Sequence, residues 1–411
     1  MPSERRTGGS LPATLLFGLA AVLLVICIVY APGEAFKASG QGLAIWWRIV
    51  FPALLPFLVL SEILLAGGFA HGLGVFMEPL ARRGYGLPGS FGWVLPLGLT
   101  AGFPAAASAA VSLYKQGKIT ATEAERMTGA AHFASPVLLV IVVAAGFLGR
   151  EELGLLLLAV HWISGLAAGI TLHWLTPGVR SRRNRQAAGH RSMGPRPSVS
   201  RLRLAVREME AAREADGRGF GKLLGDSVAA GVQTLMTTGG YMLIFAVVIH
   251  VLASALPDFI PSFSIAGLLE AHLGAYAVSQ LSMPPAIVCA LLGAILGWSG
   301  ICAFLQVRAL LRPAGIGSRL FIISRLIHGA YAYVLTLVLW RPLSRWFPGA
   351  LPAAAELQAP GVSHGSFFSF PLPDWGLIGR FVGIQFWLLL ALIAGLTVLS
   401  LLSTGGKSRS R

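Results

Sequence analysis

Long apolar segments separated by short polar connections dominate the chain. Most of them reach the roughly 20 residues that an α-helix needs to cross a hydrocarbon core of about 30 Å. The pattern predicts an all-α, polytopic membrane protein with about eight transmembrane helices and one or two re-entrant hairpins. The segments lie at residues 11–30, 43–67, 91–112, 134–149, 153–175, 227–255, 283–307, 320–340 and 377–402.

Composition agrees with this pattern. The chain has 411 residues, of which 55% are hydrophobic and only 12% are charged, whereas soluble domains carry about 25% charged residues. Enzyme signatures such as G-x-S-x-G, H-E-x-x-H, a P-loop or paired C-x-x-C motifs are absent from the sequence. The three cysteines lie in apolar segments without metal-ligand spacing. We therefore expect no enzyme activity, no catalytic residue, no metal and no cofactor.

The basic residues gather in one polar loop at residues 178–222. This loop holds 11 Arg and one Lys against four acidic residues, which gives it a net charge of +8. Because apolar segments flank the loop on both sides, the positive-inside bias explains this charge better than nucleic-acid binding does. The sequence predicts that this loop and the N-terminus, with Arg5 and Arg6, are cytoplasmic, and that the loop can contact anionic lipid head groups.

The segment 91–112 is predicted to be a re-entrant hairpin. A full crossing there would place the basic loop at 178–222 outside, against the positive-inside bias. Its centre reads Gly102-Phe103-Pro104, and a proline disfavours helix both at its own position and at the preceding one. Such irregular backbone is tolerated at membrane depth only where protein or a water-filled cavity covers it.

A similar pattern returns in the second half of the chain. Gly98–Pro104 and Gly293–Ser299 both contain G-x-x-x-G followed by an aromatic residue and a helix breaker or small polar residue. If each half has three crossings and one hairpin, the second half is an inverted repeat, as in many secondary transporters. The charge pattern instead favours a full crossing at 283–307, and the sequence leaves both arrangements open.

These features divide the chain into four parts. The division predicts a first transmembrane repeat at residues 1–177 and a basic cytoplasmic loop at 178–225. A second transmembrane repeat follows at 226–345, and a polar loop with a C-terminal transmembrane helix follows at 346–411.

The candidate binding residues are polar or irregular positions inside apolar segments. Glu62 is an acid within a span, where it either serves ion or proton coupling or pairs with a neighbouring helix or an Arg. Ser135 precedes Pro136 as a helix N-cap, and a helix start at membrane depth attracts anions. Arg325 suits an anionic substrate. The full candidate set is Glu62, Gly102, Phe103, Pro104, Ser108, His132, Ser135, Ser299, Gly300, Gln306 and Arg325.

Several of these stretches resemble one known family. Phe51–Glu62, Leu97–Pro104, Gly117–Arg126 and Gly297–Val307 resemble the YlbJ/SpoVV family of sporulation integral membrane proteins, over most of residues 10–340. The second half looks like that family's second Gate, or nucleoside-recognition-like, repeat. The resemblance implies a fold distantly related to concentrative nucleoside transporters, which carry two opposed hairpins.

The resemblance also implies a function. The family is linked to endospore formation and to moving dipicolinic acid across the outer forespore membrane, at the stage of spore cortex and core maturation. The expected partners are the lipid bilayer and a small anionic substrate, with no nucleic acid. Two alternatives stay open: a nucleoside permease, and a non-transporting scaffold that recruits sporulation membrane proteins through the loop at 178–222.

Overall fold

The computed structural model describes residues 11–176, 200–257 and 259–346, and this part of the chain contains helices and no strands. In the first half they are α1 (Leu11–Tyr30), α2 (Pro32–Ile45), the π-helical η1 (Trp46–Val50), α3 (Phe51–Ala66), α4 (Phe69–Arg83), α5 (Phe91–Ala101), α6 (Ala105–Lys115), α7 (Ala121–Ala130), the π-helical η2 (Leu138–Phe147) and α8 (Leu153–Leu175). In the second half they are α10 (Arg201–Asp216), α11 (Phe220–Ala255), α12 (Ser262–Leu269), α13 (Ala271–Ser279), α14 (Pro285–Trp298), α15 (Gly300–Leu311), η3 (Arg312–Ala314) and α16 (Arg319–Trp346).

Five helical stretches among the described residues are long and apolar enough to cross a membrane. They are Pro32–Ala66, Leu153–Leu175, Phe220–Ala255, Pro285–Ala314 and Arg319–Pro342, and each overlaps a predicted span. Aliphatic side chains on their outer faces are exposed, as a lipid-facing surface requires. These observations confirm the all-α, polytopic class, while the predicted span at 377–402 lies outside the described residues.

The first hairpin consists of α5 and α6. The chain turns back at Gly102, whose φ is +76°, and the Phe103–Pro104 peptide bond is cis. Trp93 near the start of α5 and Ser112 near the end of α6 line the same cavities. Each leg has 11 residues, about 16 Å of helix, which is too short to cross a bilayer. The predicted turn within 91–112 is therefore confirmed.

The second hairpin lies where the sequence analysis placed no element. Helices α12 and α13 fold back on each other so closely that a Cβ added to Gly274 would lie 2.3 Å from the Cα of Gly267. Helices α14 and α15 instead form one crossing that is broken at Ser299, with φ of +70°. The structure thus confirms a break near 283–307 but corrects the comparison of Gly98–Pro104 with Gly293–Ser299, since the counterpart of the first hairpin is 262–279.

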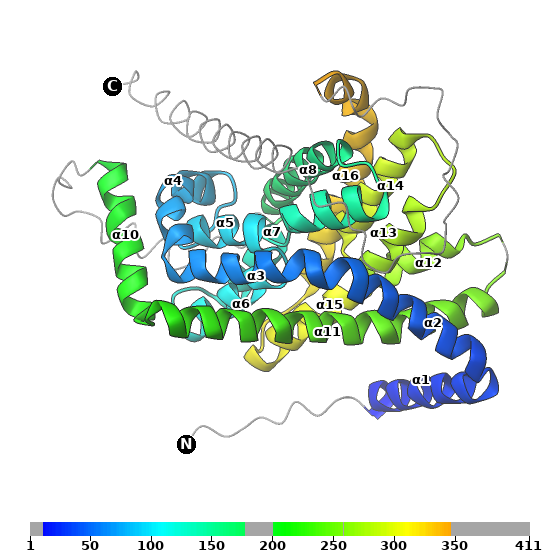
Figure 1. The fold of residues 1–411 in the computed structure, drawn as a ribbon. Helices are drawn as coiled ribbons and strands as arrows, with labels where there is room; N and C mark the ends of the chain where they lie inside the picture. Colours follow the sequence, from blue (N-terminus) through cyan, green and yellow to red (C-terminus); the bar gives the residue numbers. More distant parts are fainter. Residues whose placement is uncertain (1–10, 177–199, 258, 347–411) are drawn as a thin grey trace.

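Equivalent helices of the two halves run in opposite directions. Gly42 of α2 lies against Met242, whereas Gly231 lies against Leu58, so α2 and α3 run antiparallel to α11. Figure 1 shows this long pair, with α5 and α6 near the start of α11 and α12 and α13 near its end.

The two broken crossings are also antiparallel. Contacts of Glu125 with Leu320 and of Gly129 with Ser324 make α7 parallel to α16. Contacts of Gly297 with Gly329 and of Gly293 with Ala332 make α14 antiparallel to α16. Helix α7 therefore opposes α14, which supports the predicted inverted repeat.

This arrangement removes the conflict between inversion and charge. The backbone N–H of Leu320 donates a hydrogen bond of 2.8 Å to the Glu125 carboxylate, so the turn after α15 lies beside the turn before α7. Arg312 and Lys118, which belong to those two turns, are consequently on one side of the molecule. The second half can be inverted while its basic turn lies on the same side as that of the first half, because the hairpin of α12 and α13 precedes the second broken crossing.

This topology predicts a labelling pattern for single cysteines in a variant whose native cysteines are replaced by alanine. Gln116→Cys and Arg312→Cys are expected to react with a membrane-impermeant maleimide from the same side of sealed vesicles. Ser282→Cys, at the opposite end of α14, is expected to react only from the other side. Reaction of Gln116→Cys and Arg312→Cys from opposite sides would contradict the arrangement.

Candidate functional site

Each hairpin tip packs against a break in a crossing helix. The first tip contacts the non-helical stretch at 131–135, because a Cβ on Gly98 would lie 1.9 Å from the carbonyl oxygen of Ala131. The second tip contacts the break at Ser299, and a Cβ on Gly300 would lie 3.0 Å from the carbonyl oxygen of Leu269. The indole N–H of Trp298 also donates to the Leu268 carbonyl at 2.9 Å. Both irregular segments are thus covered by protein.

The two breaks are joined to each other through His132. Its Nε2 lies 3.2 Å from the Ser299 hydroxyl, across 167 positions of sequence. Phe103, from the first tip, stacks on the same imidazole with ring centroids 4.8 Å apart. Three residues predicted from separate motifs therefore meet at one buried place.

A small cavity of about 50 Å³ lies at this meeting point. Both hairpin tips, both helix breaks and the middle of α3 and α11 contribute to its wall. Its lining includes five predicted residues, Gly102, Phe103, Ser135, Ser299 and Gln306. Residues that the sequence analysis missed also line it: Leu54, Leu58, Thr234, Thr238, Glu270, Ala271, His272, Cys302 and Ala303.

Glu270 and His272 form a buried pair in the wall of this cavity. The Glu270 carboxylate lies 2.8 Å from Nδ1 of His272, and both side chains are almost completely buried. The same carboxylate accepts the backbone N–H of Leu273 at 2.7 Å and so caps α13. The signal in the sequence was an acid and a histidine two positions apart between apolar runs, in a segment too short to be considered a span.

The other predicted residues surround the cavity without lining it. Gly300 packs on the second hairpin tip. His132 and Arg325 lie behind the breaks, and the Arg325 guanidinium bonds to backbone carbonyls rather than facing the cavity. Pro104, Ser108 and Glu62 line a larger neighbouring space.

This larger space, the vestibule, has a volume of about 690 Å³. It lies between α3, the first hairpin and the junction of α10 with α11. The vestibule and the cavity share Leu58, Ala101, Phe103 and Thr234 in their walls, so they are adjacent. Phe103 is the aromatic residue among these shared wall residues.

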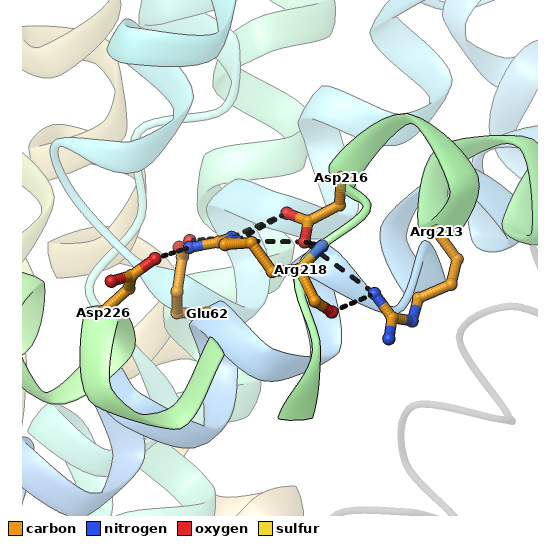
Figure 2. A network of polar contacts seen from close by, with 5 residues as sticks. All are labelled: Glu62, Arg213, Asp216, Arg218 and Asp226. Atoms are coloured by element: carbon orange, nitrogen blue, oxygen red, sulfur yellow. Dashed lines mark hydrogen bonds and ion pairs between the residues drawn. The ribbon is translucent and has the colours of Figure 1, made fainter. Parts of the chain in front are cut away.

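Arg218 organises the rim of the vestibule (Figure 2). Its guanidinium contacts the carboxylates of Asp216 at 2.6 Å, Glu62 at 3.3 Å and Asp226 at 3.4 Å. The hydrogen bonds from Arg218 hold the pKa of the Asp216 carboxyl below its usual value. Of the alternatives for Glu62, the structure shows pairing with an Arg, and this pairing ties α3 to the start of α11.

Removal of Arg218 is expected to loosen this rim, since one guanidinium holds three carboxylates from separate elements. A cysteine at Ser108, inside the vestibule, should then react faster with a soluble maleimide in an Arg218→Ala background. Arg201→Ala, an exposed change at the start of α10, is the control and should leave the rate unchanged. Equal rates in the two backgrounds would show that the network does not restrict the vestibule.

The close contact of the first hairpin with the break gives a second test. Gly98→Ala is expected to destabilise the protein by about 1–3 kcal/mol, the usual cost of overpacking, because the new methyl group meets the Ala131 carbonyl. Gly240→Ala on α11 is the matched control. It has nothing within 4 Å of an added Cβ and should stabilise the helix slightly. Thermal unfolding in detergent measures both, and equal midpoints would contradict the packing.

Comparison with known proteins agrees with this architecture. A family model described as Gate, nucleoside recognition, matches residues 47–151, from η1 through the first hairpin and the first broken crossing. The sporulation integral membrane protein YlbJ of Bacillus subtilis (strain 168) is 33% identical over 348 residues, which cover 80% of this chain and 83% of the relative. No solved structure matches. The chain therefore belongs to the family of sporulation integral membrane proteins that includes YlbJ.

Proposed function

We propose that this membrane protein transports a small anionic solute through the cavity where the two hairpins meet the two broken helices. The observation that carries the proposal is this convergence of four interruptions on one buried, polar point. Interrupted helices near the middle of an inverted repeat are the usual substrate sites of secondary transporters. A scaffold would gain nothing from such a costly arrangement at membrane depth.

The polarity of the cavity favours negative charge. Two helices start beside the cavity: the helix that begins at Pro136 and continues into η2, and α15, which begins at Gly300. The start of α13 at Ala271 is already capped by the Glu270 carboxylate. Helix N-termini present free N–H groups and the positive end of the helix dipole, and both attract anions. The hydroxyls of Ser299 and Thr238 donate to the carbonyls of Trp298 and Thr234, and each would turn from that carbonyl to donate to a bound anion.

The vestibule supplies a route from the side that bears Arg218 and α10. Its 690 Å³ falls within the usual range for small-molecule pockets, about 300–1,000 Å³, whereas the cavity beyond Phe103 is smaller than that. A solute would occupy the cavity only after Phe103 and the first hairpin tip shift. The described conformation therefore represents a closed cavity beside an open vestibule, as an alternating-access cycle requires.

Within this proposal, dipicolinate is the substrate, carried across the outer forespore membrane during sporulation. The family resemblance supplies its identity. Two features support it: Phe103, in the wall of both spaces, offers an aromatic ring on which a planar solute would stack, and two carboxylates match the two helix starts that follow the breaks. The end of α10 and Arg218, which line the vestibule, would then face the cytoplasm.

A nucleoside is the second candidate substrate, because of Glu270. Its carboxylate is an acceptor in the cavity wall and suits the hydroxyl groups of a ribose better than it suits an anion. The Gate description, nucleoside recognition, points the same way. His272 already occupies one oxygen of this carboxylate, since its Nδ1 lies 2.8 Å away.

Flux into liposomes containing the purified protein tests the proposal. Labelled dipicolinate should enter faster than into empty liposomes, and uridine in excess should not compete. No flux above empty liposomes under several imposed gradients would overturn the proposal, and competition by uridine would favour the nucleoside. The scaffold alternative predicts instead that deletion of the loop at 178–222 abolishes sporulation while variants in the cavity wall are silent.

A pair of neighbouring threonines sharpens the test. Thr238 lines the cavity, whereas Thr237 is exposed on the same helix, and both hydroxyls bond the carbonyl four residues earlier. Thr238→Val should raise the half-saturating concentration of dipicolinate about tenfold, the usual effect of losing one hydrogen bond to a charged group. Thr237→Val is the control and should leave it unchanged. Equal effects of the two substitutions would exclude contact with Thr238.

A further inference from the structure

Arg325 is a fully buried cation without an acidic partner among the described residues. It lies on α16 with 2% of its surface exposed. Its Nη1 donates to the carbonyls of His132 at 2.5 Å and Gly297 at 3.4 Å, and its Nη2 donates to the carbonyl of Gly129 at 2.5 Å. No ion pair joins it to a carboxylate in the described part of the chain. Backbone oxygen atoms therefore supply most of its solvation.

These carbonyls belong to the C-terminal ends of the two broken helices. Gly129 and His132 lie at the end of α7, and Gly297 lies in the last turn of α14. The C-terminus of a helix carries roughly half a negative charge. Two such ends together amount to about one negative charge, which one guanidinium neutralises.

Two surrounding histidines, His328 and His161, add no second charge at this point. Nδ1 of His328 lies 3.0 Å from Nη1 of Arg325, and it must accept because a guanidinium has only donors. Its Nε2 lies 3.0 Å from the His161 carbonyl and must donate, which fixes the neutral imidazole. The Nε2 of His161 accepts the backbone N–H of Ala134 at 2.9 Å. The guanidinium is thus the local positive charge.

In many secondary transporters, carbonyls at the C-terminal ends of half-helices bind the coupling ion. Here a side chain occupies that position. We propose that Arg325 is a resident cation that replaces a mobile alkali cation between the two broken helices, so that the solute crosses without coupling to a sodium gradient. Arg325 is a positioning residue that holds α7 and α14 together. The inference rests on the proposed transport function.

This role explains how the cavity favours anions. With the negative ends of α7 and α14 neutralised by Arg325, the positive ends of the following half-helices are left facing the cavity. Ser135 and Ser299 stand at those positive ends. The same residue therefore fixes the geometry of both breaks and the sign of the field at the binding point.

The first arm of the experiment measures labelled dipicolinate flux by the wild-type protein in liposomes. Flux is expected to be equal in sodium, potassium and choline buffers, and an inward sodium gradient should cause no accumulation. Accumulation driven by sodium would overturn the inference while leaving the proposed transport intact. Absence of any wild-type flux would overturn the proposed function instead.

The second arm removes the resident cation. Arg325→Ala is expected to lower flux in choline buffer about tenfold or more, because two helix ends lose the donor that they share. Sodium or guanidinium ions should restore part of this flux, and Arg325→Lys should retain part of it without added ions. Flux by Arg325→Ala that equals the wild type in choline, or that no cation restores, would overturn the role.

Thermal unfolding in detergent tests the same point without a substrate. Low-millimolar guanidinium should raise the unfolding midpoint of Arg325→Ala and leave the wild type unchanged. Arg126→Ala is the matched control. Arg126 is also buried and donates to a backbone carbonyl, that of Tyr85 at 2.6 Å, but it joins no helix break to another. An equal or larger rise for Arg126→Ala would overturn the assignment. If Arg325→Ala cannot be purified, its yield is measured with and without guanidinium in the growth medium. A higher yield with guanidinium is then expected, and an unchanged yield overturns the assignment.

Discussion

The need to satisfy interrupted backbone inside an apolar environment governs this fold. Each break leaves carbonyl and N–H groups without helical partners, and such groups are costly away from water. The structure reduces this cost by packing each hairpin tip against one of the two helix breaks. The first hairpin tip lies on the stretch at 131–135, the second tip lies on Ser299, and Arg325 joins the two sets of free carbonyls. The cavity exists because these pairings converge, and the long helices α3, α11, α8 and α16 hold them in place.

Local chemistry was enough to predict the long helices and two of the breaks. Apolar length identified the spans, Gly102-Phe103-Pro104 disrupts helix, and the recurrence of G-x-x-x-G with an aromatic residue pointed to Ser299-Gly300. The second hairpin escaped prediction because its legs have 8 and 9 residues, far below the length of a span. Because this hairpin was missing from the prediction, Gly98–Pro104 was compared with Gly293–Ser299. The charge pattern and the inverted repeat then looked incompatible. They agree once 262–279 is the hairpin and 285–311 is the crossing.

The roles of individual residues depend on contacts that are distant in sequence. Arg325 was predicted as a substrate contact, yet it bonds carbonyls more than 190 positions away. Glu62 meets Arg218 across 156 positions, so neither its partner nor its place at the vestibule rim could be inferred locally. Glu270 and His272 are close in sequence, but their importance follows only from the fold that brings them to the cavity. Ser135 could be predicted from Ser135-Pro136, a typical helix start, and Ser299 from the G-x-x-x-G pattern that precedes it.

At each break, the two halves of the helix present ends of opposite partial charge. Their C-terminal ends at Gly129 and Gly297 face a fixed guanidinium, so their negative charge is cancelled inside the protein. Their continuations start at the cavity, where no fixed carboxylate caps η2 or α15. The second hairpin differs, since the Glu270 carboxylate caps α13 and has His272 as a second partner, so the N-terminus of α13 already holds an acceptor. An anion entering the cavity would therefore be held by the broken crossings, and the second hairpin would contribute hydrogen bonds and shape rather than charge.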